Sequence, residues 1–247
     1  MSSAISTQSL YASYGPKVAL RDLTMDIPLG ASLAVIGPNG SGKSTLLGVL
    51  AGTLEPQSGT STVTGPPPSF VMQSTTVDPS LPITVRDTVS MGRYSSLGLF
   101  GRFQPADRQA VQDAMERVAI DDLESRQLHE LSGGQRQRVF VAQGLAQETD
   151  VVLLDEPVTG LDVTSHSIIL DLIDEEVALG RTIVVTTHSL DEARRCDNVL
   201  ILNTSAIALG TPDEVLTENN LREAFGGNFV RIGDKFILDD PHHHHHH

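Results

Sequence analysis

A short glycine-rich stretch, GPNGSGKS at positions 37–44, contains the residue types that bind phosphate groups. It matches the pattern G-x-x-x-x-G-K-[ST] in full, between an apolar run at 31–37 and the helix-forming sequence STLLGVLAG. Glycines allow consecutive backbone N–H groups to curl around phosphate oxygens, and the N-terminus of the following helix adds the positive end of its dipole. The stretch therefore predicts a nucleotide-binding loop.

Two side chains of this loop would supply the charge and the metal-binding oxygen. The Lys43 ammonium would pair with the β- and γ-phosphates, and the Ser44 hydroxyl would supply an oxygen to Mg²⁺. Only three lysines occur in the chain, and one of them falls where the pattern requires it. The alternative, an ordinary glycine-rich turn, would match all four fixed positions by chance in well under ~1% of chains this long.

Ionisable side chains end two further apolar runs. VVLLDE (151–156) ends in Asp155 and Glu156, and TIVVTTH (182–188) ends in His188. In an open parallel sheet, ligands bind beyond the carboxyl ends of the strands, so these side chains are expected near the nucleotide. We expect Asp155 to hold Mg²⁺ through a water, Glu156 to act as general base on the attacking water, and His188 to orient that water. A solvated acidic turn and a structural histidine are the alternatives.

The stretch LSGGQ at 131–135 begins a predicted helix in an unusual way. Ser132 and Gln135 have the spacing of a capping box, with the serine at the N-cap and the glutamine three residues later. Gly133 and Gly134 fill the positions between them, although glycine is among the poorest helix formers. Because a helix start alone does not need them, we expect another group to come close to this backbone.

Composition limits the classes of partner. The 247-residue chain has a formal net charge of −14, which argues against binding to nucleic acid and against polybasic attachment to anionic lipid. It has no apolar run near the roughly 20 residues that span a bilayer and no signal peptide, and its single cysteine, Cys196, fits a reducing compartment. We therefore expect a soluble, cytoplasmic protein. His129 and His166 lack a functional placement and are interpreted as surface or packing residues, and 242–247 as a purification tag.

The surrounding segments predict an α/β fold. Alternating residues around SLYASYG and VALRDLTMDIP indicate antiparallel strands at the N-terminus. From Thr84 to Ala146 the pattern is mostly helical, with a glycine-rich break at 96–105. Beyond it strands and helices alternate, with capping boxes that begin at Ser189 and Thr211, which indicates a mostly parallel sheet. We expect one α/β core with an inserted helical subdomain.

GPNGSGKST, LSGGQ, VVLLDE and TTH occur in this order, and on these motifs the sequence resembles the ATP-binding-cassette (ABC) ATPases over almost all of residues 5–225. The resemblance implies a P-loop NTPase core of the RecA-like type, with an N-terminal antiparallel β subdomain and an inserted α-helical subdomain. It implies one domain over 1–241, composed of a nucleotide-binding core at 1–73 and 147–241 and a helical signature subdomain at 74–146.

The same resemblance implies ATP and Mg²⁺ as ligands and adds roles for single residues. Tyr14 would stack on adenine, Gln73 would contact Mg²⁺ and water, and Asp162 in TGLD would face an opposite subunit. In this family LSGGQ completes the ATP site of a second copy in a head-to-tail dimer. The residues expected to contact ATP are Tyr14, Gly37, Pro38, Asn39, Gly40, Ser41, Gly42, Lys43, Ser44, Thr45, Ser132, Gly133, Gly134, Gln135 and Asp162. Those expected in catalysis are Glu156, His188, Gln73 and Lys43, and those at Mg²⁺ are Ser44, Gln73 and Asp155.

A finer resemblance concerns the transported solute. The stretches TVRDTVSMGRYSSLGLFGR at 84–102 and AFGG at 224–227 are similar to ATPases that import manganese, zinc and iron. This implies a bacterial importer subunit at the cytoplasmic face of the membrane, with separate integral membrane permeases and an extracytoplasmic solute-binding protein. The alternatives are import of an iron chelate or another small solute, and a cytosolic cassette protein of translation or DNA repair. A P-loop kinase or GTPase would leave LSGGQ and TGLD unexplained.

Overall fold

The computed structural model describes residues 2–73, 78, 80–97, 102–226, 229–232 and 235–238. The strands are β1 (Ser3–Tyr14), β2 (Lys17–Pro28), β3 (Ser32–Ile36), β4 (Ser58–Val63), β5 (Ser69–Val71), β6 (Val151–Asp155), β7 (Thr182–Thr186), β8 (Asn198–Asn203), β9 (Ser205–Gly210), β10 (Phe229–Ile232) and β11 (Lys235–Leu238). The α-helices are α1 (Lys43–Leu50), α2 (Val85–Leu97), α3 (Pro105–Arg117), α4 (Gly133–Leu145), α5 (Val163–Ala178), α6 (Leu190–Ala193), α7 (Pro212–Val215) and α8 (Glu218–Phe225). The expected tag, and residues 98–101 of the expected glycine-rich break, lie outside the described residues.

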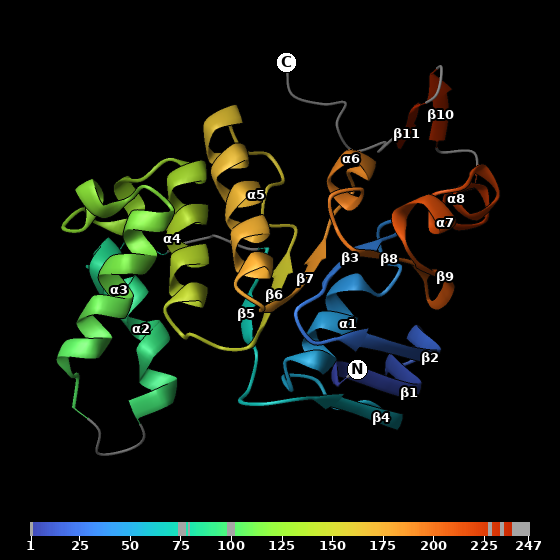
Figure 1. Cartoon of the computed structure of the whole chain (residues 1–247), viewed down its shortest axis with the longest axis horizontal. Coiled ribbons are helices and arrows are strands. Elements are labelled where there is room, and N and C mark those ends of the chain that lie inside the picture. The colour runs from blue at the N-terminus through green and yellow to red at the C-terminus, as the bar shows by residue number, and fades with distance from the viewer. Residues whose placement is uncertain are drawn as a thin grey trace.

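A six-stranded sheet forms the centre of the molecule, in the order β5-β6-β7-β3-β8-β9 (Figure 1). Its neighbouring strands pair in parallel except β9, which runs antiparallel to β8. Every residue of β3, β6 and β7 is buried, as expected for parallel strands covered on both faces. The predicted mostly parallel sheet is confirmed. The antiparallel edge strand, which follows β8 after a bend at Thr204, was not predicted.

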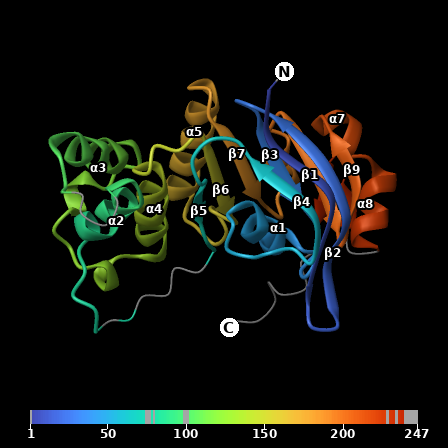
Figure 2. The same cartoon turned by 90° about the horizontal axis from the view of Figure 1, so that it is seen from below.

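Side chains alternate between two cores along the central strands. Leu33 and Val35 of β3 pack with helix α1 and the N-terminal strands, whereas Ala34 and Ile36 pack with helix α5 and the helical region. Figure 2 shows α1 and α5 on opposite sides of the sheet. Because both faces are covered by apolar side chains, the strand ends are the places where this sheet can carry polar groups.

The N-terminal strands form a separate antiparallel sheet in the order β2-β1-β4. The antiparallel β1 and β2 were predicted, whereas β4 was not. Its inward side chains, which include Ile5, Leu10 and Leu23, are fully buried in the core that they share with α1. Helix α1 contacts both β2 and β4. This packing holds the backbone of β2 against the loop that precedes α1.

Helices α2, α3 and α4 pack on one another to one side of the central sheet (Figure 1). Gly92 of α2 lies so close to α4 that a Cβ atom there would be 2.2 Å from the Gln143 carbonyl oxygen. Arg93 ties the helices together, since its Nε donates to Asp107 Oδ1 at 2.9 Å and its Nη1 to the Ala146 carbonyl at 2.8 Å. The mostly helical middle of the chain is therefore confirmed.

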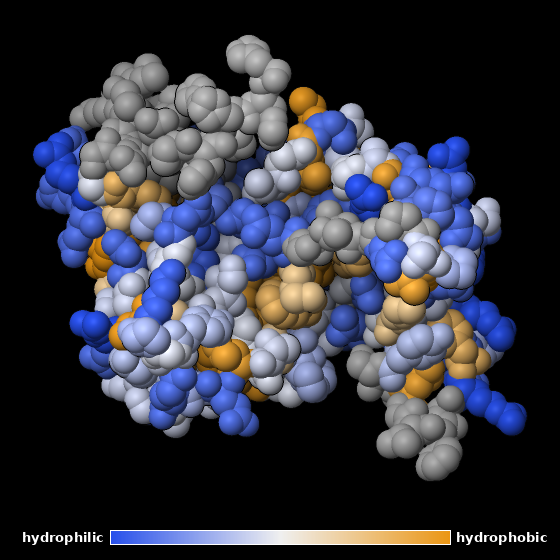
Figure 3. All heavy atoms as spheres, turned by 180° about the vertical axis from the view of Figure 1, so that it is seen from behind, coloured by the Kyte–Doolittle hydropathy of each residue, from blue (hydrophilic) through white to orange (hydrophobic). Residues whose placement is uncertain are grey.

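No helix in the part of the chain that the structure describes is long and apolar enough to cross a membrane. The face shown in Figure 3 is mainly hydrophilic, with separate apolar spots. Large apolar side chains that are exposed include Met72, Leu81, Met91 and Tyr94. Met72 and Leu81 belong to the segment that joins β5 to α2, and Met91 and Tyr94 lie in α2 itself.

The close contact of α2 with α4 predicts that Gly92→Ala destabilises the fold. The added methyl group would meet backbone, which cannot rotate away, and such overpacking costs about 1–3 kcal/mol, partly offset by the ~1 kcal/mol gain in helix propensity. We expect a net loss of up to about 2 kcal/mol in the free energy of unfolding, measured by urea denaturation. Gly133→Ala is the matched control, because its methyl group would meet no atom within 4 Å. An equal effect of both changes would contradict the prediction.

Candidate nucleotide-binding and catalytic site

The glycine-rich pattern forms a tight loop between β3 and α1, as predicted. A Cβ atom on Gly37 would lie 2.0 Å from the Leu202 carbonyl oxygen, and one on Gly42 would lie 2.3 Å from the Ala19 carbonyl oxygen. Gly42 also has a φ of 105°, in the left-handed region that side chains disfavour. Strands β2 and β8 therefore require glycine at these two positions, independently of any ligand.

The donors of this loop fit a triphosphate with a cation beside it. The first N–H groups of α1 have no acceptor within the helix, and they carry the positive end of its dipole. The side chain of Lys43 is buried, and its Nζ donates to the Gly37 carbonyl at 2.9 Å and to the Pro38 carbonyl at 3.4 Å. Ser44, next to it, is exposed. A positively charged cradle of backbone donors with an accessible hydroxyl suits ATP and Mg²⁺.

Strands β6 and β7 end side by side, which brings their polar residues together. Asp155 pairs with Thr186 in the parallel ladder. The Thr186 hydroxyl donates to Asp155 Oδ1 at 2.6 Å and accepts a hydrogen bond from the Glu156 N–H at 2.8 Å. One threonine thus fixes both carboxylate-bearing residues. Sequence reasoning assigned no role to Thr186, although its place in TTH was an available signal.

Glu156 connects three segments that are distant in sequence. Its Oε1 lies 2.6 Å from His188 Nε2, and its Oε2 lies 2.6 Å from Gln73 Nε2. Its φ of 49° is uncommon for a residue with a side chain, and such strained positions cluster at functional sites. The structure therefore brings the predicted residues Glu156, His188 and Gln73 into direct contact.

The charges around Glu156 determine its protonation state. Burial raises the pKa of the Glu156 carboxyl, but the hydrogen bond and charge of His188, the charge of Lys43 and a bond from Thr159 together lower it more, so that the net pKa lies below its usual value. The carboxylate is therefore ionised at neutral pH and able to accept a proton.

The predicted capping box at the start of α4 is confirmed, since Ser132 Oγ accepts from the Gln135 N–H at 3.2 Å and Gln135 Oε1 accepts from the Ser132 N–H at 3.0 Å. The two glycines between them differ. Gly133 is exposed, and a Cβ there would meet no atom within 4 Å. A Cβ on Gly134 would lie 2.6 Å from Asp162 Oδ2 and 2.6 Å from Ser165 Oγ. The group that approaches Gly134 is thus the start of α5 in the same chain, and only Gly133 presents backbone with open space beside it.

Asp162 serves as the N-cap of α5. Its Oδ1 accepts from the Ser165 N–H at 2.9 Å, and its Oδ2 accepts from the Ser165 hydroxyl at 2.9 Å. Helix α5 and strand β6 lie between α4 and α1 in Figures 1 and 2. The phosphate loop and LSGGQ of one chain are therefore not brought together.

The expected adenine-stacking residue lies at the end of β1. Tyr14 is 56% exposed, so its ring has a face open to a ligand. The start of β2 approaches the phosphate loop, because the position of a Cβ on Gly40 would be 3.6 Å from Lys17 Nζ. Lys17 is a second cation beside the loop that the sequence analysis did not identify.

Comparison with known proteins agrees with these observations. The family model described as ABC transporter matches residues 20–159. The manganese transport system ATP-binding protein MntB of Listeria innocua is 38% identical over 227 residues, which cover 89% of this chain and 95% of that protein. The zinc transport system ATP-binding protein TroB of Treponema pallidum is 39% identical over 232 residues, which cover 91% of this chain and 87% of that protein.

Among solved structures, a metal-chelate-type ABC transporter in an inward-facing conformation has a similar fold. The TM-score is 0.81 at 29% sequence identity, and the match covers 96% of both chains. The motifs, the fold and the relatives agree, and this chain belongs to the ABC transporter family as one of its ATP-hydrolysing cassettes.

Proposed function

We propose that this ABC ATPase energises the uptake of a transition-metal ion, namely manganese, zinc or iron, by a bacterial importer. The observation that carries the proposal is its similarity, over about nine-tenths of both chains, to proteins named as manganese and zinc transport subunits. The likeness to a metal-chelate-type transporter supports the same class of cargo. The same likeness keeps an iron chelate as the second candidate.

We assign ATP binding to the loop at 37–45 and the ligands of Mg²⁺ to Ser44, Gln73 and Asp155. When bound, Mg²⁺ neutralises the phosphate oxygens during transfer. Lys43 would add its charge at the β- and γ-phosphates. Asp155 is 5% exposed and already accepts a bond from Thr186, which suits a ligand that holds the cation through a water.

Glu156 and His188 would carry the hydrolysis. An ionised carboxylate within hydrogen-bonding reach of the attacking water can accept its proton as the bond to phosphorus forms. His188 would hold that carboxylate in place and bond the γ-phosphate. Gln73 would link changes at the nucleotide to movement of the helical region, because it contacts Glu156 and lies in the segment that leads to α2.

A second copy of the chain would complete the site. Ser132 and Gly133 are exposed at the start of α4, and α5 and β6 separate them from the phosphate loop of their own chain. Their hydroxyl and N–H groups would bind the γ-phosphate of ATP held by a partner in a head-to-tail dimer. Asp162, also exposed, would face that partner, and Tyr14 would stack on adenine.

The helical region, residues 74–146, would transmit the closure of this dimer to integral membrane permeases. The exposed apolar side chains Leu81, Met91 and Tyr94 of this region, and Met72 just before it, favour a protein contact there. The chain would thus sit at the cytoplasmic face of the membrane through its permeases. An extracytoplasmic solute-binding protein would deliver the metal ion to them.

The role of Glu156 predicts that Glu156→Gln slows ATP hydrolysis by about 10²–10⁴-fold while ATP binding is retained. An amide keeps the shape of the side chain but cannot take the proton. The measurements are phosphate release and ATP affinity by calorimetry. Glu116→Gln, an exposed residue of α3, is the control. Undiminished hydrolysis in Glu156→Gln would refute the assignment of the base.

The role of LSGGQ predicts that Ser132→Arg leaves ATP binding to the monomer nearly unchanged but abolishes the ATP-dependent dimer and most of the hydrolysis. The bulk and charge of arginine would fill the space beside Gly133. Ser132→Ala is the matched variant, because it loses the same hydroxyl and the same N-cap bond, worth about 1 kcal/mol, without adding bulk, so the difference between the two variants measures the effect of bulk and charge. The dimer is measured by sedimentation in the presence of ATP, with each Ser132 variant combined with Glu156→Gln so that ATP is not hydrolysed during the run. A normal rate of hydrolysis in Ser132→Arg would exclude the shared site.

Transport by the complete complex tests the cargo. The chain, its permeases and its solute-binding protein would be reconstituted in liposomes and supplied with Mn²⁺, Zn²⁺, Fe²⁺ or a ferric chelate. We expect ATP-dependent accumulation of a free divalent ion, absent in the complex that carries Glu156→Gln. Accumulation of the ferric chelate alone would support the second candidate. Co-purification with ribosomes or DNA in place of permeases would contradict both.

A further inference from the structure

The turn that carries His188 is fixed by its neighbour Thr187. Thr187 is 3% exposed, and its hydroxyl accepts from the Ser189 N–H at 2.9 Å and bonds Glu192 Oε2. Because Thr187 and His188 are consecutive, a shift of the Thr187 hydroxyl moves the backbone on which the imidazole stands. The carboxylate that holds this hydroxyl therefore influences where His188 lies.

The Glu192 carboxylate does not make the contact that the sequence predicts. Ser189 and Glu192 have capping-box spacing, and Ser189 Oγ does accept from the Glu192 N–H at 3.3 Å. The reciprocal bond of a capping box, in which the Ser189 N–H donates to the Glu192 carboxylate, is not made, because this N–H donates to the Thr187 hydroxyl instead. One carboxylate oxygen bonds Thr187, and the other lies 3.1 Å from His166 Nε2. A residue expected to cap its own helix instead joins two other segments.

His166 connects this carboxylate to the start of α5. It lies in the first turn of the helix, and its N–H donates to the Asp162 carbonyl at 2.9 Å. Asp162 ends the segment that begins at Glu156. A continuous set of contacts therefore runs from Asp162 through His166 and Glu192 to the turn that carries His188, and this histidine returns to Glu156.

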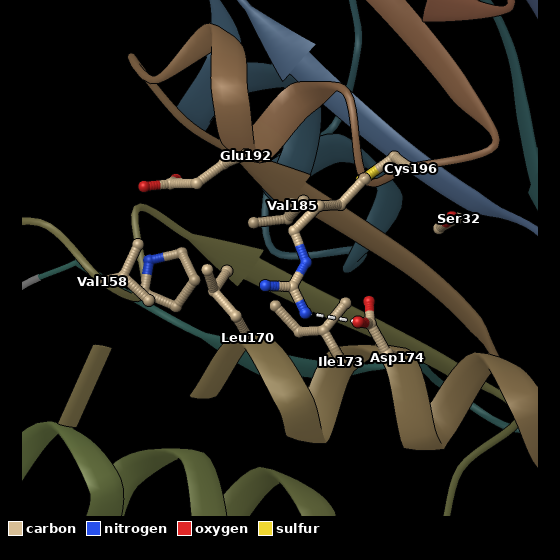
Figure 4. Close-up of a pocket in the computed structure, with 10 residues that line it drawn as sticks. Ser32, Val158, Leu170, Ile173, Asp174, Val185, Glu192 and Cys196 are labelled. Carbon is tan, nitrogen blue, oxygen red and sulfur yellow. Dashed lines mark hydrogen bonds and ion pairs between the residues drawn. The ribbon is translucent and has the colours of Figure 1, made fainter. Parts of the chain in front are cut away.

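A cavity between α5 and the α6 region shows why these polar contacts matter. Its walls include Val158, which follows β6, and Leu170 and Ile173 of α5. Glu192 and Cys196 line the other side (Figure 4). Burial raises the pKa of the Cys196 thiol to about 12, so the cysteine stays protonated and the cavity is not a reactive-thiol site. Polar contacts join the two segments beside this cavity: His166 contacts Glu192, and Arg195 pairs with Asp171 and Asp174 of α5. Of these, the contact of Glu192 is the one that continues to the turn carrying His188.

We propose that Glu192 and His166 are positioning residues for hydrolysis: they hold the turn at 187–189 so that His188 lies against Glu156, and they make this contact depend on the first turn of α5. The proposal rests on the catalytic roles proposed above for Glu156 and His188. Neither Glu192 nor His166 needs to touch ATP. Their loss should therefore change the rate of the chemical step and not the affinity for nucleotide.

The test compares Glu192→Ala, Glu192→Gln and His166→Ala in the full-length chain assembled with its permeases. We expect Glu192→Ala to lower kcat about 10–100-fold with KM for ATP changed less than about twofold, as displacement of a positioned group does. The glutamine carbonyl can still accept from Thr187, and its amide can donate to His166 Nε2 when the ring proton is on Nδ1, so Glu192→Gln should restore most of the rate. Asp191→Ala, which removes the exposed neighbouring carboxylate on α6, is the control and should leave kcat unchanged.

The combination of changes tests the link itself. If His166 acts through Glu192, His166→Ala should lower kcat by at least about threefold, and the double variant His166→Ala/Glu192→Ala should be no slower than Glu192→Ala alone. His166 is partly exposed, so we expect His166→Ala to fold and to test the proposal even if Glu192→Ala does not fold. Full additivity, an unchanged kcat in His166→Ala, or a raised KM would overturn the proposal. If Glu156→Gln also hydrolyses ATP normally, the catalytic assignment fails instead.

Discussion

The parallel pairing of β3, β6 and β7 is the constraint on which the site depends. The side chains along these strands are buried in two apolar cores, so the polar residues lie at the ends of the strands. Parallel strands stop at the same edge, which places the phosphate loop, Asp155 and the His188 turn together. The Thr186 hydroxyl then fixes the positions of Asp155 and Glu156 relative to β7, because it bonds the last residue of β6 and the residue that follows it.

Much of this arrangement could be predicted from the sequence because it follows from periodicity and from local rules. Continuous apolar runs gave the buried strands, capping boxes gave the starts of α4 and α7, and the loop pattern gave the junction of β3 with α1. The antiparallel strand β9 was missed, because none of its residues is fully buried and burial along it does not alternate, so it lacks the pattern of a strand with one face in the core. The assignment of Gln73 to the site came only from the family resemblance, and its contact with Glu156 was not predicted, since no local rule joins residues that far apart.

The glycines show where sequence reasoning gives the right residue for an incomplete reason. Gly37 and Gly42 were expected to serve phosphate, yet each is also required by a carbonyl group of an adjacent strand. Gly134 was expected to serve a ligand, yet it makes room for Asp162 and Ser165. At each of these positions a Cβ atom would come closer than van der Waals contact to an atom of another segment, and nothing in the neighbouring sequence reveals this. Gly133 alone has no internal reason, so an external contact best explains its choice.

The start of α5 contacts both LSGGQ and the segment that leads to His188. Ser165 and Asp162 lie against Gly134 of the signature helix, and His166 reaches the His188 turn through Glu192. A displacement of α4, such as one caused by a ligand beside Gly133, would press first on this turn of α5, because the Gly134 backbone leaves no free space there. The same turn would then carry the displacement to Glu192. Under the roles proposed above, one short helical segment would thus connect a displacement of α4 to the position of His188 in the same chain.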